Sequence, residues 1–185
     1  LCRQVLATRP ARLVLYEISE YALYAIDMEL RARAEGMEVV AILGSVCDGD
    51  SVARALAGQA VDIVLHAAAY KHVPLVEDNA LEGARNNIFG TATLVDACGR
   101  QGVERFILVS TDKAVRPTNV MGATKRMAEL VVQDRQTRTA KTRLTMVRFG
   151  NVLGSSGSVI PLFRSQIEAG GPITLTHPEV TRYFM

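Results

Sequence analysis

A hydroxyl, a carboxylate and an amine follow one another at Thr111-Asp112-Lys113, directly after an apolar run from Arg105 to Ser110. Such a trio can supply an acid, a base and a hydrogen bond that orients a substrate. The alternative is a structural Asp–Lys pair at the surface, but exposed pairs add little stability. These three residues are therefore the strongest candidates for chemistry in the sequence.

Met121 and Lys125 lie four residues apart in a segment with helical periodicity, Asn119–Arg138. Positions i and i+4 share one helix face, so the two side chains point the same way. A lone lysine on a helix is usually solvated, and Lys125 alone would be weak evidence for a site.

The elements that must position these residues are short apolar runs that alternate with helical segments, which predicts an α/β fold with a doubly wound parallel sheet. Continuous Val, Ile and Leu runs predict strands buried on both faces. The expected strands are Arg12–Glu17, Glu38–Leu43, Val61–His66, Arg105–Ser110, Arg143–Phe149 and a short Ile173–Leu175. The expected helices are Leu1–Leu6, Glu20–Glu35, Asp50–Leu56, Glu77–Arg100, Asn119–Arg138 and Val159–Glu168.

Ligands bind beyond the carboxyl ends of the strands in such sheets, so the residues that follow each strand are candidates. Glu17 can accept hydrogen bonds from the two hydroxyls of an adenosine ribose and would repel a 2′-phosphate, which favours NAD over NADP; it can also be a solvated loop carboxylate. Asp48 can contact an adenine amino group or cap a helix. The small residues of His66-Ala67-Ala68-Ala69 allow a flat cofactor, or a packed helix, to approach closely.

Two further segments carry polar groups that need partners. The turn Gly150–Gly154 exposes backbone amides and contains Asn151, which suits a phosphate, although it can also be a helix-capping loop. Asn86 and Asn87 lie within an apolar helical stretch. Because buried amides need partners, we expect one of the two to brace a neighbouring loop.

The composition excludes several classes of protein. With 185 residues, 49% apolar and a net charge of +2, the chain is an ordinary globular protein without the basic footprint of a nucleic-acid binder. No apolar run reaches the length of about eighteen residues that spans a membrane. The three cysteines, Cys2, Cys47 and Cys98, lack metal-ligand spacing, so we expect no metal site and a reducing cytoplasm.

Four segments together resemble the polysaccharide-biosynthesis branch of the extended short-chain dehydrogenases/reductases, which includes the UDP-N-acetylglucosamine 4,6-dehydratases. The segments are His66–Pro74, Ser110–Pro117, Met121–Lys125 and Arg148–Gly154. The resemblance extends over the whole chain and implies an NAD(P)-binding Rossmann fold. It also implies oxidation of carbon 4 of a UDP-sugar, loss of the carbon 5 proton with expulsion of the carbon 6 hydroxyl, and return of the hydride to carbon 6.

The resemblance assigns a role to each matching residue. Asp112 would protonate the leaving hydroxyl, and Lys113 would remove the carbon 5 proton, which requires a lowered lysine pKa. Thr111 would bond the sugar near carbon 4, and Lys125 the nicotinamide ribose. The implied cofactor contacts are Glu17, Ser19, Val46, Asp48, His66, Ala67, Ala68, Ala69, Lys71, Asn86 and Lys125. The implied substrate contacts are Lys71, Thr111, Asn151, Ser158, Val159 and Arg182.

Two departures from the family pattern matter. Met121 stands where the family motif Tyr-x-x-x-Lys has its tyrosine, and a thioether cannot transfer a proton. Either the hydride step is lost or, as we favour, Asp112 or Lys113 acts twice with Thr111 as a relay. The glycine-rich loop is also absent, and Leu1–Thr8 matches the helix that follows it. We therefore expect residues 1–185 to be a partial Rossmann domain, with two strands lacking the neighbour between them and a substrate-binding lobe from about residue 152.

The alternatives are a nucleotide-sugar 4-epimerase, a non-catalytic dinucleotide-binding sensor and a structural fragment. An epimerase depends more directly on the missing tyrosine, whereas Met121 favours a sensor and the intact Thr111-Asp112-Lys113 does not. The resemblance implies a UDP-sugar as partner and a homo-oligomer. It also implies a cytoplasmic domain of a parent attached to the inner membrane, because Met at this position resembles the large membrane-attached members.

Overall fold

The computed structural model describes residues 1–138, 141–153, 159–175, 179, 181 and 184. In these ranges the strands are β1 (Arg12–Glu17), β2 (Glu38–Leu43), β3 (Ile63–His66), β4 (Arg105–Thr111) and β5 (Arg143–Phe149). The helices are α1 (Cys2–Ala7), α2 (Glu20–Arg31), α3 (Gly49–Gln59), α4 (Val73–Asp78), α5 (Ala80–Ala84), α6 (Gly90–Gln101), α7 (Val120–Arg138) and α8 (Val159–Glu168). A π-helix, Arg85–Phe89, joins α5 to α6, and a 3-10 turn, Asp112–Ala114, follows β4.

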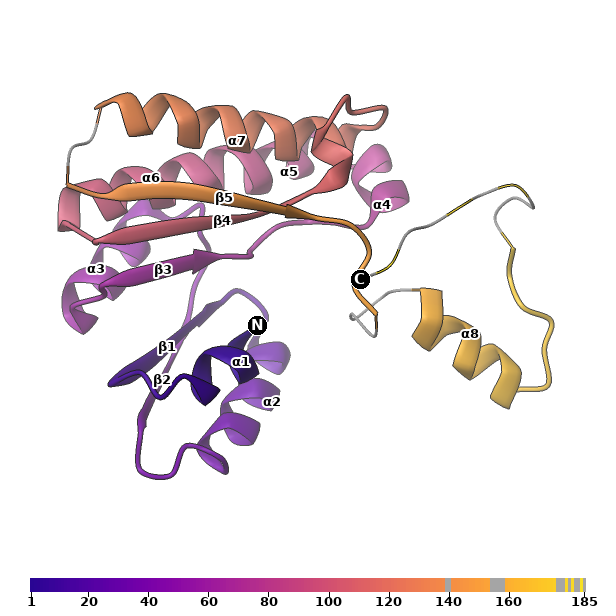
Figure 1. The fold of residues 1–185 in the computed structure, drawn as a ribbon, viewed down its shortest axis with the longest axis horizontal. Helices are drawn as coiled ribbons and strands as arrows, with labels where there is room; N and C mark the ends of the chain where they lie inside the picture. Colours follow the sequence, from indigo (N-terminus) through magenta and orange to yellow (C-terminus); the bar gives the residue numbers. More distant parts are fainter. Residues whose placement is uncertain (139–140, 154–158, 176–178, 180, 182–183, 185) are drawn as a thin grey trace.

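The strands form two parallel sheets, in the orders β1-β2 and β3-β4-β5. Over the described ranges, β1 has a strand partner only in β2, and β3 only in β4. Figure 1 shows β1 on the side of β3 that is turned away from β4. The structure therefore confirms the parallel α/β fold.

Each sheet packs its apolar side chains against its own helices. Phe106 and Leu108 of β4 are 0% exposed and lie in one core with residues of α3, α6 and α7, which cover the same face of β3-β4-β5 (Figure 1). A second core joins Leu15 of β1 and Val39 of β2 to Leu30 of α2. α8 lies to the side of both sheets and has no buried residue.

Several expectations from the sequence need correction. The strands are not buried on both faces: alternate residues of β4 are fully and partly buried, and much of β5 is exposed, because α6 and α7 cover only one face. The helix at Glu20 ends at Arg31 and does not reach Glu35, which with Gly36 takes positive φ angles of 47° and 88° in the turn that follows. Ile173–Leu175 is not a strand.

The helix expected over Glu77–Arg100 is broken into four pieces. It begins earlier, at Val73, because His72 accepts a hydrogen bond from Leu75 N–H and Pro74 fits the first turn. Smaller differences are that β3 begins at Ile63, α3 runs from Gly49 to Gln59 and β4 extends to Thr111.

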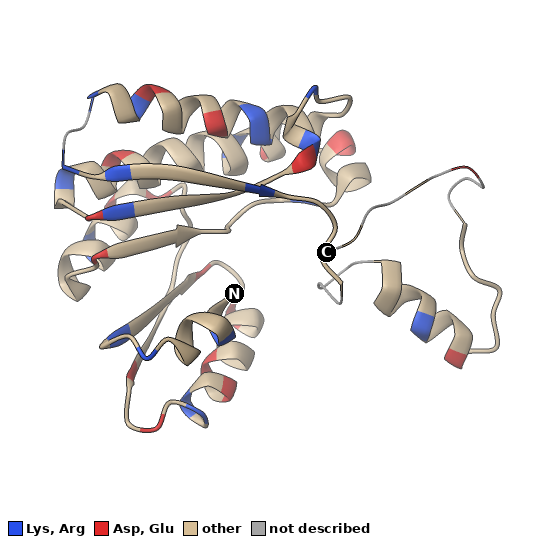
Figure 2. Cartoon of the chain, in the orientation of Figure 1, with Lys and Arg blue, Asp and Glu red and all other residues tan. Residues whose placement is uncertain are grey.

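Charged residues of both signs are spread over the two sheets and their helices (Figure 2). None of the helices that the structure describes is both long and apolar enough to cross a membrane. Within the same residues, no three His, Cys, Asp or Glu side chains gather as a metal site would require.

Candidate active site

The Thr111, Asp112 and Lys113 side chains form one hydrogen-bonded cluster where β4 ends. Thr111 Oγ1 donates to Asp112 Oδ1 at 3.0 Å, and Lys113 Nζ donates to the same oxygen at 3.1 Å. Thr111 Oγ1 also accepts from Lys113 N–H, which fixes the turn. The Asp112 and Lys113 side chains are 54% and 37% exposed, so the trio faces solvent and can meet a substrate.

The cluster holds Asp112 as a carboxylate. Burial by itself raises the pKa of Asp112, but hydrogen bonds from Lys113 and Thr111 and the charge of Lys113 outweigh it and lower this pKa below its ordinary value. Asp112 and Lys113 therefore form an ion pair.

Helix α7 carries Met121 and Lys125, which are buried at 3% and 6% exposed. Lys125 Nζ donates to the backbone oxygen of Val109 in β4 at 2.7 Å. Burial lowers the pKa of Lys125 to about 8, against the opposing charge of Glu129. Lys125 therefore loses its positive charge at a pH only slightly above neutral.

Gly122 sets how closely α7 approaches the catalytic candidates. A Cβ atom at this position would lie 2.5 Å from the backbone oxygen of Lys113, so only glycine allows this contact. The Asn119 side chain caps the same turn by accepting from Gly122 N–H at 2.8 Å. The start of α7 is thus packed directly against the turn that carries Asp112 and Lys113.

Asn87, in the π-helix, braces the loop that follows β3. Its Oδ1 accepts from Tyr70 N–H at 2.8 Å, and its Nδ2 donates to Tyr70 O at 3.0 Å and to Thr124 Oγ1 of α7 at 2.9 Å. This confirms the expectation that one asparagine braces a loop. Asn86, the cofactor candidate, donates instead to Asn87 Oδ1 at 3.1 Å.

His66 ends β3 as a neutral, buried histidine. Its ring lies 2.9 Å from Thr91 Oγ1, and burial together with the charge of Lys125 lowers its pKa to about 3. Ala67 is exposed and Ala68 and Ala69 are half-buried, so small side chains line the start of the next loop.

The carboxyl end of β1 carries Glu17 and Ser19. Glu17 Oε1 accepts from the N–H groups of Ile18 and Ser19, both at 2.9 Å, and Ser19 caps α2. A carboxylate has about four acceptor positions, so two ribose hydroxyls remain compatible with this turn. The remaining acceptor positions of Glu17 thus fit the two hydroxyls of a ribose.

Two cofactor candidates that follow β2, Val46 and Asp48, have structural roles. Asp48 Oδ1 accepts from Ser51 N–H at 3.0 Å and caps α3. Val46 is 6% exposed and belongs to the core, where it would meet any side chain added at Gly90.

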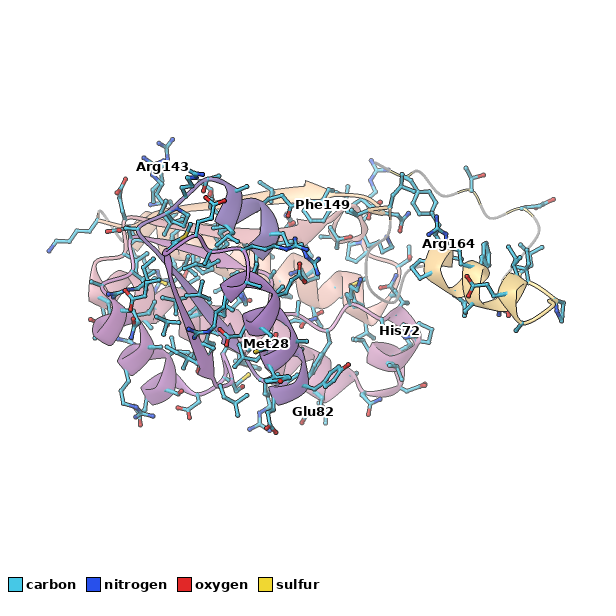
Figure 3. The ribbon with its side chains drawn as sticks, turned by 90° about the horizontal axis from the view of Figure 1, so that it is seen from below. Met28, His72, Glu82, Arg143, Phe149 and Arg164 are labelled. Carbon is cyan, nitrogen blue, oxygen red and sulfur yellow. The ribbon has the colours of Figure 1, made fainter. Side chains whose placement is uncertain are left out.

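The substrate candidates are less closely grouped. Lys71 lines a pocket of about 390 Å³ with Tyr70, His72 and residues of α4 and α5. Asn151 is half-buried and forms a bridge with Phe184, and Val159 opens α8. Figure 3 shows Phe149 at the end of β5 opposite Arg143, with Arg164 of α8 farther out on that side. Ser158 and Arg182 lie outside the described residues.

Glu129 of α7 is a polar residue of the site region that the sequence reasoning missed. Its side chain is 0% exposed and is bonded to Ser110, Arg126 and Arg148. Its position four residues after Lys125 was the available signal, because the two share a helix face.

The chain is similar to several known proteins. The capsular polysaccharide biosynthesis protein CapD of Staphylococcus aureus is 47% identical over all of this chain, which covers 31% of that protein. The inverting UDP-N-acetylglucosamine 4,6-dehydratase of Campylobacter jejuni is 36% identical over 96% of this chain and 52% of its own length. Another relative, from Rickettsia canadensis, is named UDP-glucose 4-epimerase.

Among solved structures, the dTDP-glucose 4,6-dehydratase DesIV of Streptomyces venezuelae, crystallised with NAD and TYD, matches with a TM-score of 0.78 at 26% identity. The match covers 92% of this chain and 58% of that one. The chain thus spans from 31% to 58% of the length of these proteins.

The family model described as "polysaccharide biosynthesis protein" matches residues 1–185. The relatives named above are nucleotide-sugar dehydratases and epimerases as well as polysaccharide-biosynthesis proteins. With its Rossmann-type strands and the Thr111-Asp112-Lys113 cluster, the chain belongs to the polysaccharide biosynthesis protein family of nucleotide-sugar dehydratases and epimerases.

Proposed function

We propose that the full-length protein carrying this chain is an NAD(P)-dependent 4,6-dehydratase of a UDP-N-acetylglucosamine-type sugar, a hydro-lyase of cell-surface glycan biosynthesis. The observation that carries the proposal is the 3.1 Å hydrogen bond between Lys113 Nζ and Asp112 Oδ1 at the open end of β4. An acid and a base held side by side suit an elimination, in which one proton leaves and another is delivered.

The cofactor, when bound, accepts a hydride from carbon 4 of the sugar and returns it to carbon 6. Lys125, which donates to Val109 O, would bind the nicotinamide ribose. Glu17 would hold the adenosine ribose and favour NAD, with NADP as the alternative. Asn151 would lie near the sugar diphosphate.

Elimination requires Lys113 as a neutral amine and Asp112 as a neutral acid, which is the reverse of their ion pair. Asp112 would take up the proton of the carbon 4 hydroxyl, and Lys113 would lose its own proton to solvent when the substrate binds. Loss of water around the pair favours the neutral amine, because it penalises charged groups. Lys113 then removes the carbon 5 proton, and Asp112 protonates the departing carbon 6 hydroxyl.

The proton of the carbon 4 hydroxyl needs another acceptor, since Met121 stands in the usual tyrosine position. Thr111 donates to Asp112 at 3.0 Å, so its hydroxyl can pass this proton to the carboxylate before elimination begins. Asp112 would then carry the proton from carbon 4 oxidation that it later delivers to the departing carbon 6 hydroxyl.

The proposal also covers the organisation of the whole protein. Residues 1–185 would be a partial cofactor-binding domain with the substrate lobe starting at about residue 152, supported by the unpaired edges of β1 and β3. The parent would be a homo-oligomer with this domain in the cytoplasm, attached to the inner membrane. A relative named as a membrane protein supports the attachment.

The second candidate is a nucleotide-sugar 4-epimerase, favoured by the epimerase relative. It has no need of an Asp–Lys pair and depends on the tyrosine that Met121 replaces. We therefore place the dehydratase first.

The test is to give the full-length protein UDP-N-acetylglucosamine and to follow the product by mass spectrometry. We expect a 4-keto-6-deoxy sugar with net loss of one water. UDP-N-acetylgalactosamine at unchanged mass would indicate the epimerase, and binding without turnover would indicate a sensor.

A further inference from the structure

The Glu129 carboxylate lies fully buried where α7 crosses the ends of β4 and β5. Its Oε1 accepts from Ser110 Oγ and from Arg148 Nε, both at 2.7 Å. Its Oε2 accepts from Arg148 Nη2 and, at 2.9 Å, from Arg126 Nη1. One carboxylate therefore takes four charge-assisted or hydroxyl hydrogen bonds from three elements of the fold.

Two of these partners occupy a single paired position of the sheet. Ser110 of β4 is the register partner of Arg148 of β5, so Glu129 ties the two neighbouring strands together at one level. Ser110 immediately precedes the Thr111-Asp112-Lys113 cluster, and Arg148 precedes the turn that carries Asn151. Glu129 therefore holds Ser110, which leads into the Thr111-Asp112-Lys113 cluster, and Arg148, which leads into the turn with Asn151.

Glu129 also faces Lys125, which lies one helical turn earlier on α7. Around Lys125, His66 on β3 is neutral, the arginines at 126 and 148 are bound by Glu129, and the Asp112–Lys113 pair beyond β4 is closed on itself. Glu129 is the charge that raises the pKa of Lys125 against the effect of burial.

We propose that Glu129 is a positioning residue for the reaction: it fixes the ends of β4 and β5 to α7 and supplies the negative charge opposite Lys125. This inference rests on the proposed function, because the reaction in question is the proposed dehydration. The contacts of Glu129 are independent of that proposal. Stability alone gives no strong reason for a buried carboxylate at position 129, because well-packed apolar residues often replace a buried ion pair without loss of stability.

The first test is Glu129→Gln in the full-length protein, which keeps the size of the side chain and removes its charge. We expect kcat for dehydration to fall by about tenfold, with a smaller change in KM, because the catalytic segments are misplaced. The alkaline limb of kcat/KM, near the Lys125 pKa of about 8, should move to lower pH by about half a unit. Wild-type kcat and an unmoved limb in folded Glu129→Gln would overturn the proposal.

The matched control is Asp96→Asn. This carboxylate also joins α7 to another element, through Arg135 at 2.7 Å, but lies away from the strand ends. We expect its kcat and pH profile to equal those of the wild type. If Asp96→Asn moves the limb equally, the effect is a general one and the proposal fails.

Ser110→Ala decides the matter if Glu129→Gln does not fold. It removes only the hydroxyl donor and leaves both arginines on Glu129. We expect kcat to fall by about fivefold, the equivalent of one hydrogen bond. Wild-type kcat in this variant would contradict the positioning role.

NADH affinity, measured by fluorescence against pH, separates this proposal from the proposed function. If the wild type gives no dehydrated product, the function fails, but the affinity comparison between wild type and Glu129→Gln remains valid. Loss of affinity at a lower pH in the variant supports the role of Glu129 opposite Lys125. Identical affinity profiles overturn it.

Discussion

Two ion-pair clusters adjoin the end of β4: the Glu129 network at Ser110, and the Asp112–Lys113 pair directly after Thr111. They differ in exposure and in the sequence separation of their members. The Asp112–Lys113 pair is half-exposed and its two members are sequence neighbours. Glu129 is fully buried, and its partners Ser110 and Arg148 come from two strands. An exposed pair contributes little stability and can exchange its proton, whereas a buried network is fixed. We therefore expect the Asp112–Lys113 pair to transfer protons and the Glu129 network to hold the strand ends in position.

The largest effect should come from the exposed cluster and should appear only in the rate. Asp112→Asn and Lys113→Met should each lower the dehydration rate by about 10²–10⁴-fold, the usual contribution of an acid or a base. The midpoint of thermal unfolding should hardly change, because the pair is half-exposed. Product formation and thermal unfolding are measured on the same preparations.

The control is Glu104→Gln at the opposite end of β4. Glu104 and Arg105 are also exposed sequence neighbours, paired at 3.0 Å. This variant should keep the wild-type rate. Normal rates in both Asp112→Asn and Lys113→Met would show that the catalytic groups lie elsewhere.

The buried cluster should behave in the opposite way, with its largest effect on stability. Glu129→Ala leaves two arginines without their carboxylate and should lower the free energy of unfolding by about 3 kcal/mol. The exposed pair Arg12–Glu38 provides the comparison, since Glu38→Gln should cost less than about 1 kcal/mol. Urea unfolding measures both, and equal losses would remove the contrast between buried and exposed pairs.

The same carboxylate should leave a signature in acid. Burial raises the pKa of Glu129, but hydrogen bonds from Arg148, Ser110 and Arg126 outweigh it and bring the folded value to about 2, below the ordinary 4.5. The stabilisation is therefore complete above pH 4.5 and is lost as the pH falls towards 2. The difference in stability between wild type and Glu129→Ala should shrink through this window in a series of urea titrations. A constant difference would mean that Glu129 is not ionised in the folded protein.

A smaller effect is expected at Gly122, where α7 approaches the turn that carries Asp112 and Lys113. Gly122→Ala would push α7 away from the Lys113 carbonyl and should lower the rate by about tenfold. Gly58→Ala in α3 is the matched control, because nothing lies within 4 Å of the added Cβ atom. It should keep the wild-type rate and add up to about 1 kcal/mol of stability. Equal rates in the two variants would show that this close approach is unimportant.

The exposed cluster could be predicted from the sequence because its members are consecutive. Any strand that ends at Thr111 places Asp112 and Lys113 beside it, and the alternation of apolar runs with helical periods was enough to find that strand. The parallel α/β class followed from the same pattern.

The buried cluster could not be predicted in this way. Glu129 meets Ser110 and Arg148, each 19 residues away, only once β4 and β5 have adopted their register. The break at Arg85–Phe89 has a similar origin, since Asn87 takes partners 17 and 37 residues away, at Tyr70 and Thr124. Periodicity carries no information on such long-range polar contacts.

The most direct test of the account is exchange at carbon 5 of the sugar in deuterated water, measured by mass spectrometry. Wild-type full-length protein should give a 4-keto-6-deoxy product that carries deuterium at carbon 5, and Lys113→Met should give neither exchange nor product. Exchange at the wild-type rate in Lys113→Met would contradict the assignment of chemistry to the exposed cluster of β4.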